Sequence, residues 1–408
     1  MKSTISFVPA ACVSLLSLCA ALSATDRIVD AVGGPGTYPT VQAAINAALP
    51  GDRVLIRAGV YPGFSVTKSI HVLGVGTDIG DVVVGPVHLG LGFPNQNYHV
   101  SIAHLRIDAG PVAPLAVSGQ ELGAGQIEFE SVQVEGGFRL LAGEPSFVLS
   151  MANCTVIGDI GQGFDGGTCT IAAPAPSYFT ITRCFFQGAR GDLFAAQPPL
   201  AGLLLDRGVT AQIEQCQMRG GRGDIAQAGA PGLYVRQAQV RSFGTGSVAT
   251  GGDGGIAAAG GPGVRTTSTV QHGTVTVAGG IGTPNGPTVA GGGALLPAGG
   301  IVPELQFAID GGLVGPVSVR PGTPVAWHLA CPVGGVVLMS IAIGDPRPAP
   351  LDRLVVDPGL AQFLPADADF VVPPLGDFQG LPLFFQAVAL DPASTYPATA
   401  AYAVHVDG

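Results

Sequence analysis

Short runs of alternating apolar and polar residues, separated by glycine-rich turns, recur along the first two thirds of the chain. One run begins at Cys184 (Cys-Phe-Phe-Gln-Gly) and returns 32 residues later at Cys216 (Cys-Gln-Met-Arg-Gly). A second run begins at Gly202 (Gly-Leu-Leu-Leu) and returns at Gly232 (Gly-Leu-Tyr-Val) and Gly263 (Gly-Val-Arg). Alternation places every second side chain on one face of a strand, and recurrence at a nearly fixed offset indicates one unit stacked on the next. The pattern predicts a parallel β-helix, which we expect to be right-handed because strands twist with a fixed hand.

The repeat extends toward the N-terminus with offsets between 22 and 32 residues. The same strand position recurs at Leu105, Val132, Cys154, Cys184, Cys216 and, more weakly, Ala238. Variable offsets are expected where turns of different length leave one face of a solenoid. No long helical pattern lies beyond the start of the chain, so the expected fold class is all-β.

A short amphipathic helix is predicted just before the first coil. Thr40 suits the N-cap position, and four apolar residues behind it fall on one face at helical spacing, namely Val41, Ala44, Ile45 and Ala48. A helix at this place would cover the open end of the β-helix and its exposed strand edges.

Composition divides the rest of the chain into segments. Residues 26–278 carry the repeats, and the glycine-rich residues 279–301 predict a flexible link. From residue 302 onward glycine falls, proline rises, and short apolar runs recur between proline-rich turns. Residues 302–408 therefore predict a small C-terminal β-sandwich.

The first residues have the pattern of an export signal. Lys2 is followed by an uncharged apolar run (residues 5–22) with Ala-Leu-Ser at its end, which suits cleavage before Ala24. We predict a signal peptide over residues 1–23 and an exported protein, extracellular or at the cell surface. An uncleaved membrane anchor is the alternative, since the run is nearly long enough to span a bilayer. After the signal, the sequence predicts no transmembrane segment.

Charge narrows the choice of partners. The chain has a formal net charge of −10, and only 11% of its residues are charged. Nucleic acid and an anionic membrane surface are therefore not expected as partners. The 47% hydrophobic content argues against disorder, and we expect a monomer.

Five cysteines would remain after signal cleavage: Cys154, Cys169, Cys184, Cys216 and Cys331. In an oxidising compartment they could pair, because adjacent coils lie about 4.8 Å apart, within disulfide range. The alternative, which we favour, is a stack of buried free thiols that pack as small apolar side chains.

Three short motifs near the N-terminus carry a more specific signal: Thr40-Val-Gln-Ala-Ala-Ile45, Pro50-Gly-Asp52 and Gly59-Val-Tyr61. This series resembles the N-terminal cap and first coil of pectinesterases and other members of the pectin lyase-like superfamily. The resemblance implies a right-handed parallel β-helix, but that superfamily includes lyases, hydrolases, esterases, epimerases and non-catalytic adhesins. Pectinesterases carry Gly-x-Tyr-x-Glu in the first coil, whereas this chain has Gly63 in place of the Glu. We therefore carry over no catalytic residue.

The repeat also brings charged residues into equivalent turns. Asp192 and Asp224 each follow an Arg-Gly pair (Arg190 and Arg222), and Asp253 lies in the turn of the next coil. Carboxylates stacked about 5 Å apart would suit a calcium ion at Asp192 and Asp224 or an acid and base pair. The arginines would hold the carboxylate of a uronate substrate. The alternative, which we favour, is that each Asp caps its glycine turn and pairs with a neighbouring Arg.

Two classes of function follow. The first, which we favour, is a non-catalytic β-helix that presents a rigid surface for adhesion or carbohydrate contact. The second is a polysaccharide lyase or glycoside hydrolase of the pectin lyase-like kind, acting on acidic polysaccharide through the charged turns. A catalytic wall requires outward carboxylates flanked by aromatic residues for sugar stacking, and only Phe194 and Tyr234 are near in sequence. Capped or buried carboxylates would favour the first class.

Overall fold

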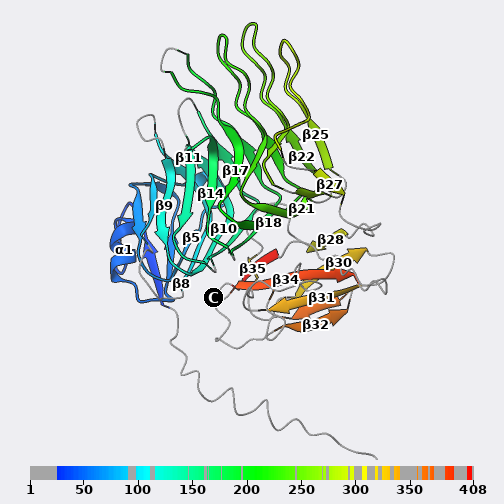
Figure 1. Ribbon diagram of the computed structural model, residues 1–408. Coiled ribbons are helices and arrows are strands. Elements are labelled where there is room, and N and C mark those ends of the chain that lie inside the picture. Colours follow the sequence, from blue (N-terminus) through cyan, green and yellow to red (C-terminus); the bar gives the residue numbers. More distant parts are fainter. Residues whose placement is uncertain are drawn as a thin grey trace, which may run out of the picture.

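The computed structural model (Figure 1) describes most of the first three quarters of the chain. The described residues are 25–90, 98–110, 115–145, 147–159, 163, 165–175, 177–193, 196–243, 246–268, 270–272, 275–292 and 295–297. Between residues 306 and 406 the strands are described, together with Val356 and Ala361. The predicted signal peptide, Phe194 and Cys331 lie outside the described residues.

Each coil contributes up to three strands, and equivalent strands of successive coils pair side by side. The first position is held by β1 (Asp26–Val29), β2 (Arg53–Ile56), β5 (Ile70–Gly74), β8 (Tyr98–Asp108), β10 (Gly125–Glu135), β12 (Phe147–Ala152), β15 (Ser177–Thr182), β18 (Val209–Glu214), β21 (Gln239–Phe243), β24 (Val270–His272) and β27 (Leu295–Pro297). The second position is held by β3 (Gly59–Tyr61), β6 (Val82–Val84), β13 (Thr155–Ile157), β16 (Phe185–Gln187), β19 (Gln217–Arg219), β22 (Ser247–Thr250) and β25 (Val275–Ala278), with β8 and β10 running through both positions. Together these strands form one eighteen-stranded sheet.

The third position forms a separate nine-stranded sheet. Its members are β4 (Phe64–Val66), β7 (Val87–Leu89), β9 (Leu115–Leu122), β11 (Gly137–Ala142), β14 (Gly167–Ala172), β17 (Ala201–Asp206), β20 (Leu233–Arg236), β23 (Val264–Thr266) and β26 (Val289–Ala290). The pairings within both sheets are parallel, as between β14 and β17 or β15 and β18. The described chain is thus all-β, as the repeats predict, and its long parallel sheets are compatible with a parallel β-helix.

The core is a set of apolar ladders that cross the coils. One ladder pairs Val72 with Ile102, Ile102 with Phe129, and Phe129 with Met151, and these side chains are at most 1% exposed. Burying each such side chain contributes roughly 1.5–3 kcal/mol. Alternation along each strand, seen already in the sequence, produces this ladder because every second residue points inward.

The predicted cap is present as helix α1 (Val41–Ala47), with a single 3-10 turn, η1 (Ile79–Asp81), further along. The Thr40 side chain accepts a hydrogen bond from the Ala43 N–H (3.2 Å), as its N-cap role requires. Val41, Ala44 and Ile45 are buried against the first coil. Among the described residues, no helix has the length and apolar character needed to span a membrane.

The parallel stack continues into the segment that the sequence predicts to be a link. β26 pairs with β23, and β27 pairs with β24, so residues 289–290 and 295–297 add strands to the preceding coil. The glycines of residues 279–288 form one more turn of the coil.

Two further sheets lie in the C-terminal region predicted to be a β-sandwich. One holds β28 (Gln306–Ile309), β30 (Pro324–Ala330) and β33 (Ala368–Val371), all antiparallel. The other holds β29 (Ser318–Val319), β35 (Tyr402–Val406), β34 (Pro382–Ala389), β31 (Gly335–Ser340) and β32 (Gln362–Pro365), antiparallel except between β29 and β35. Val337 and Phe385 are fully buried in it. The predicted boundaries of this domain stay a prediction.

Candidate functional site

Four glycine-rich turns stand next to one another where the second strand of a coil leads into the third, and we call them the glycine fingers. Their bounds are 188–200, 220–232, 251–263 and 279–288, with residues 194–195 not described. In Figure 1 the fingers project together beyond β17 and β22, away from the body of the stack.

The backbone of the fingers has a period of three residues. In the second finger, Gly220 donates its N–H to the carbonyl oxygen of Thr250 (2.9 Å) and Gly223 donates to that of Asp253 (2.8 Å). Neighbouring outgoing limbs repeat the spacing with the donor pairs Gly188 and Gly191, and Gly251 and Gly254. Three residues per turn, outside any helix or strand, is the repeat of polyproline II. The hydrogen-bond donors of the fingers share this three-residue spacing, and we call the outgoing and returning halves of each finger its limbs.

Glycine is required where these limbs pack backbone against backbone. A Cβ atom at Gly252 would lie 2.0 Å from the carbonyl oxygen of Gly221, and one at Gly220 would lie 1.9 Å from that of Ala230. The limbs also bridge one another, since Ala230 donates to Gly221 (3.0 Å) and Gly252 donates to Ala230 (2.8 Å). At these positions the lack of a side chain permits the close packing of one limb on another.

The hydrogen-bond register decides which charged residues of the fingers share a row. Asp192 and Asp224 occupy one row, because each directly follows an equivalent donor glycine. Asp253 instead directly precedes the donor glycine of its finger, as Arg190 and Arg222 do in theirs. The three aspartates lie in the predicted turns, but Asp253 belongs to the row of the two arginines.

Two of these carboxylates bind the backbone of a neighbouring finger. Asp224 Oδ2 accepts the Leu193 N–H (3.1 Å), and Asp253 Oδ1 accepts the Ile281 N–H (2.8 Å). Hydrogen bonds from the N–H groups of Leu193 and Ile225, helped by two nearby guanidinium groups, hold the pKa of Asp224 below its ordinary value. Asp224 and Asp253 thus each cap a backbone N–H group of a neighbouring finger.

The backbone of Asp192 exchanges two hydrogen bonds of 2.8 Å with the backbone of Gln197. Within the part of the chain that the structure describes, no group of three or more His, Cys, Asp or Glu side chains is placed to hold a metal ion. Calcium at Asp192 and Asp224 stays a prediction.

The nine-stranded sheet carries a second row of side chains, polar except at Leu204. Register pairs the members one coil apart, in the order Ser65, His88, Ser118, Arg139, Thr170, Leu204, Tyr234 and Arg265. Thr170 and Leu204 are buried, so the row is accessible at its two ends. His88 and Ser118 mark one end, joined by a 3.1 Å contact between Nδ1 and Oγ.

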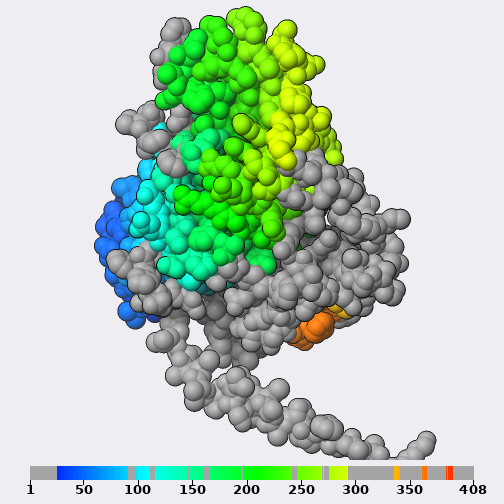
Figure 2. Space-filling model, in the orientation of Figure 1, coloured from blue at the N-terminus to red at the C-terminus, as the bar shows by residue number. Residues whose placement is uncertain are grey.

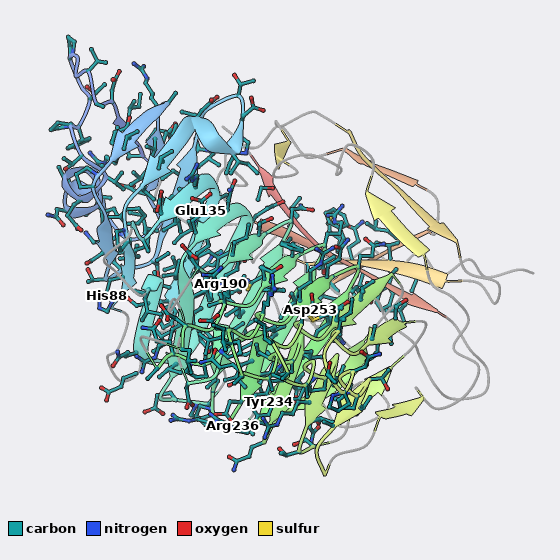
Figure 3. All side chains as sticks on the ribbon, turned by 90° about the horizontal axis from the view of Figure 1, so that it is seen from above. His88, Glu135, Arg190, Tyr234, Arg236 and Asp253 are labelled. Atoms are coloured by element: carbon teal, nitrogen blue, oxygen red, sulfur yellow. The ribbon has the colours of Figure 1, made fainter. Side chains whose placement is uncertain are left out.

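Tyr234 and two arginines form the other end of the row. The Arg265 guanidinium carbon lies 5.0 Å from the centre of the Tyr234 ring, and that of Arg236 lies 6.0 Å from it. Both distances suit a cation–π contact. Figure 3 shows Tyr234 and Arg236 side by side on one side of the molecule. Arg265 is exposed and forms no ion pair with another described residue.

Arg236 is held by two carboxylates. It pairs with Asp206 (2.6 Å), which is buried, and with Asp165 in the turn before β14. Hydrogen bonds to Asp206 and Asp165 raise the pKa of Arg236. Asp165 lies 71 residues earlier in the chain, so this network fastens a turn onto the sheet face. We call Tyr234, Arg236 and Arg265, with Asp165 and Asp206, the Tyr234 site.

The Tyr234 site combines two arginines with two aspartates, and both aspartates pair with the same arginine. Burial lowers the pKa of Arg139, with the nearby Arg207 acting in the same direction and Asp165 opposing it. Asp206 and Asp165 both pair with Arg236, whereas Arg265 forms no ion pair with another described residue. The arrangement can bind a carboxylate, for which the guanidinium fork is matched.

The sequence contains a signal for this site that the candidate residues above do not use. Gly232-Leu-Tyr-Val and Gly263-Val-Arg recur in the repeat, which places Tyr234 and Arg265 at the same strand position of adjacent coils. Tyr234 therefore lies on the sheet face and not among the aspartates of the fingers.

Three comparisons with known proteins identified no relative of this chain. A scan against protein-family models, a search of curated proteins and a search of solved structures each found no match. The structural support for the resemblance noted in the sequence is the set of large parallel sheets, and no family match accompanies it.

Proposed function

We propose that this protein is an exported, non-catalytic protein of the pectin lyase-like kind that binds acidic polysaccharide at the Tyr234 site. The observation that carries the proposal is the exposed Arg265, which lies against the Tyr234 ring and forms no ion pair with a carboxylate of the described residues. The ring orients the guanidinium, and its N–H groups are then available to a uronate carboxylate.

The surrounding sheet supports this role. Parallel strands about 4.8 Å apart make a rigid face, and Arg236 locks the adjoining turn to it. A preformed site loses little conformational entropy on binding. The resemblance of residues 40–61 to pectin lyase-like proteins agrees with a carbohydrate ligand.

The non-catalytic part of the proposal rests on the fingers. Asp224 and Asp253 accept backbone hydrogen bonds, which gives both carboxylates a structural role. Asp253 is also out of register with the other two aspartates, so the three do not form one continuous wall.

Binding to immobilised polygalacturonate and alginate, with dextran as the neutral control, tests the proposal. Arg265→Gln and Tyr234→Ala should each weaken binding at least about tenfold, because a charge-assisted hydrogen bond contributes about 1.5–3 kcal/mol. Arg190→Gln with Arg222→Gln removes positive charge from the fingers and serves as the matched control. Equal binding by the Arg265→Gln and control variants would refute the site, and release of reducing ends or unsaturated products would refute the non-catalytic role.

A further inference from the structure

The outer face of the eighteen-stranded sheet carries a row of polar side chains that is buried. Register pairs its members one coil apart, in the order Ser101, Glu128, Ser150, Thr180 and Gln212. Each directly precedes an apolar core residue, as Glu128 precedes Phe129, so alternation turns the row away from the core. All members of the row are nevertheless at most 3% exposed. Another part of the chain therefore covers this face, and we call these residues the polar row.

The C-terminal five-stranded sheet lies next to this face. Its strand β35 lies close to β12, the strand that carries Ser150, and Figure 1 shows β35 beside the parallel stack. In the order of that sheet, β34 and β31 separate β35 from β32. β32 is at the surface, where Phe363 is 67% exposed, and Figure 2 shows it in orange. The sheet therefore approaches the polar row with β35 and not with β32.

The polarity of the row limits the strength of this contact. The Glu128 carboxylate is held within its own sheet, by a 3.0 Å contact with His99 Nε2 and a hydrogen bond from the Gln126 side-chain amide. The Thr180 hydroxyl is buried and has no hydrogen-bond partner among the described residues. Burying a hydroxyl in this way is unfavourable, because the group loses its water without gaining a partner. Contacts between two parts of one chain permit relative motion unless they are large and apolar, and this side of the contact is polar.

We propose that the polar row is the docking surface of the chain's own C-terminal sheet, and that this docking is reversible. In the docked state, which is the one described above, the row is covered. In the undocked state its hydroxyl, carboxylate and amide groups regain water, which offsets the loss of the contact. The row lies on the eighteen-stranded sheet and the Tyr234 site on the nine-stranded sheet, so the inference does not depend on polysaccharide binding.

Thiol labelling of one introduced cysteine tests both the covering of the row and its release. Ser150→Cys is placed in protein that lacks residues 1–23 and carries Cys331→Ser, where the four described cysteines are buried. We expect it to be labelled about 10- to 1000-fold more slowly than the exposed control His88→Cys, because a minor state is populated at roughly 0.1–10%. Labelling as fast as that of His88→Cys would show an uncovered row, and no labelling before unfolding would show permanent docking. Either result would overturn the proposal.

Small-angle X-ray scattering of the full chain tests which segment covers the row. In Thr180→Arg a long charged side chain replaces a threonine that is 1% exposed, so the C-terminal sheet should leave the face and the radius of gyration should rise. His88→Arg places the same side chain on an exposed position of the nine-stranded sheet and should leave the radius unchanged. Circular dichroism verifies that the strands are intact in both variants. Ser150→Cys combined with Thr180→Arg should be labelled nearly as fast as His88→Cys, and faster labelling without a larger radius would overturn the proposal, because another segment would then cover the row.

Discussion

Asp224 holds the backbone of Leu193, 31 residues earlier in the chain, through a 3.1 Å hydrogen bond from the Leu193 N–H to Asp224 Oδ2. One carboxylate thereby joins two fingers, and the ionised side chain accepts this bond more strongly than the protonated one. This hydrogen bond is also the largest cause of the lowered pKa of Asp224.

A pH-dependent contribution to stability follows for Asp224. Because its folded-state pKa is lowered, the carboxylate contributes stability above the unfolded-state pKa of about 3.9. That contribution is lost as the pH falls through the lower folded-state pKa. Asp224→Asn should therefore be less stable than wild type at pH 7, with the difference shrinking on acidification below about pH 4. Thermal unfolding between pH 3 and 7 measures this, and Asp192→Asn is the control without the bond to Leu193. A difference that grew in acid would contradict the assignment.

The packing of the fingers predicts a strong effect of a single methyl group. In Gly252→Ala the new Cβ would lie 2.0 Å from the Gly221 carbonyl oxygen, so two limbs must separate. We expect a loss of at least about 3 kcal/mol in unfolding free energy, the upper range for overpacking. Gly80→Ala is the control, because a Cβ at Gly80 meets nothing within 4 Å. Chemical denaturation compares the two, and a near-neutral Gly252→Ala would show that the limbs are loosely packed.

The sequence predicts the strands well because the two-residue alternation within each strand and the offset between successive coils are both visible in it. Cys184 and Cys216 mark equivalent positions in the sequence, and the Cys184 N–H lies 3.4 Å from the Cys216 sulfur in the structure. The finger register was harder to predict. Asp192 and Asp253 each lie ten residues before the glycine near the start of the next strand, so the sequence aligns them with each other. The hydrogen bonds instead set the register from the preceding strand, and there Asp253 is equivalent to Arg190.

The Tyr234 site depends on contacts that a repeat does not contain. The pairing of Tyr234 with Arg265 follows from one coil offset. The salt bridge from Arg236 to Asp165 spans 71 residues and forms because a turn folds over the sheet face. Spacing within one coil carries no information about that turn. The repeat in the sequence therefore places Tyr234 beside Arg265, but it does not place Asp165 beside Arg236.

The N-terminal cap should depend on Asp52, which is 4% exposed. Its carboxylate accepts N–H groups from Leu49 and Thr25 (2.9 Å each) and pairs with Arg27 (3.1 Å). Asp52→Ala leaves these donors without their acceptor, and we expect a loss of about 3 kcal/mol. Denaturant unfolding measures the loss. Asp30→Ala, which breaks a more exposed ion pair with Arg57, should cost far less.

The stacked cysteines should be unreactive in the folded protein. Cys154, Cys169, Cys184 and Cys216 are free thiols and at most 2% exposed. Burial raises the pKa of Cys154, Cys169 and Cys216, which suppresses the reactive thiolate. In protein that lacks residues 1–23 and carries Cys331→Ser, a thiol reagent should label none of the four until denaturant is added. Rapid labelling of the native protein would contradict their burial.

We expect Arg236 to contribute mainly to stability and Arg265 mainly to ligand binding. Arg236→Gln leaves the buried Asp206 without its cation, so we expect a loss of about 2 kcal/mol in stability. Arg265→Gln removes an exposed charge that forms no ion pair with a described residue, and stability should change by less than about 0.5 kcal/mol.

The effects of the two substitutions on polysaccharide binding should also differ. Arg265→Gln should weaken binding at every temperature, whereas Arg236→Gln should weaken it mainly as the fold loosens on warming. Unfolding curves and binding isotherms on the same two variants decide the matter, and a stability loss confined to Arg265→Gln would reverse the assignment.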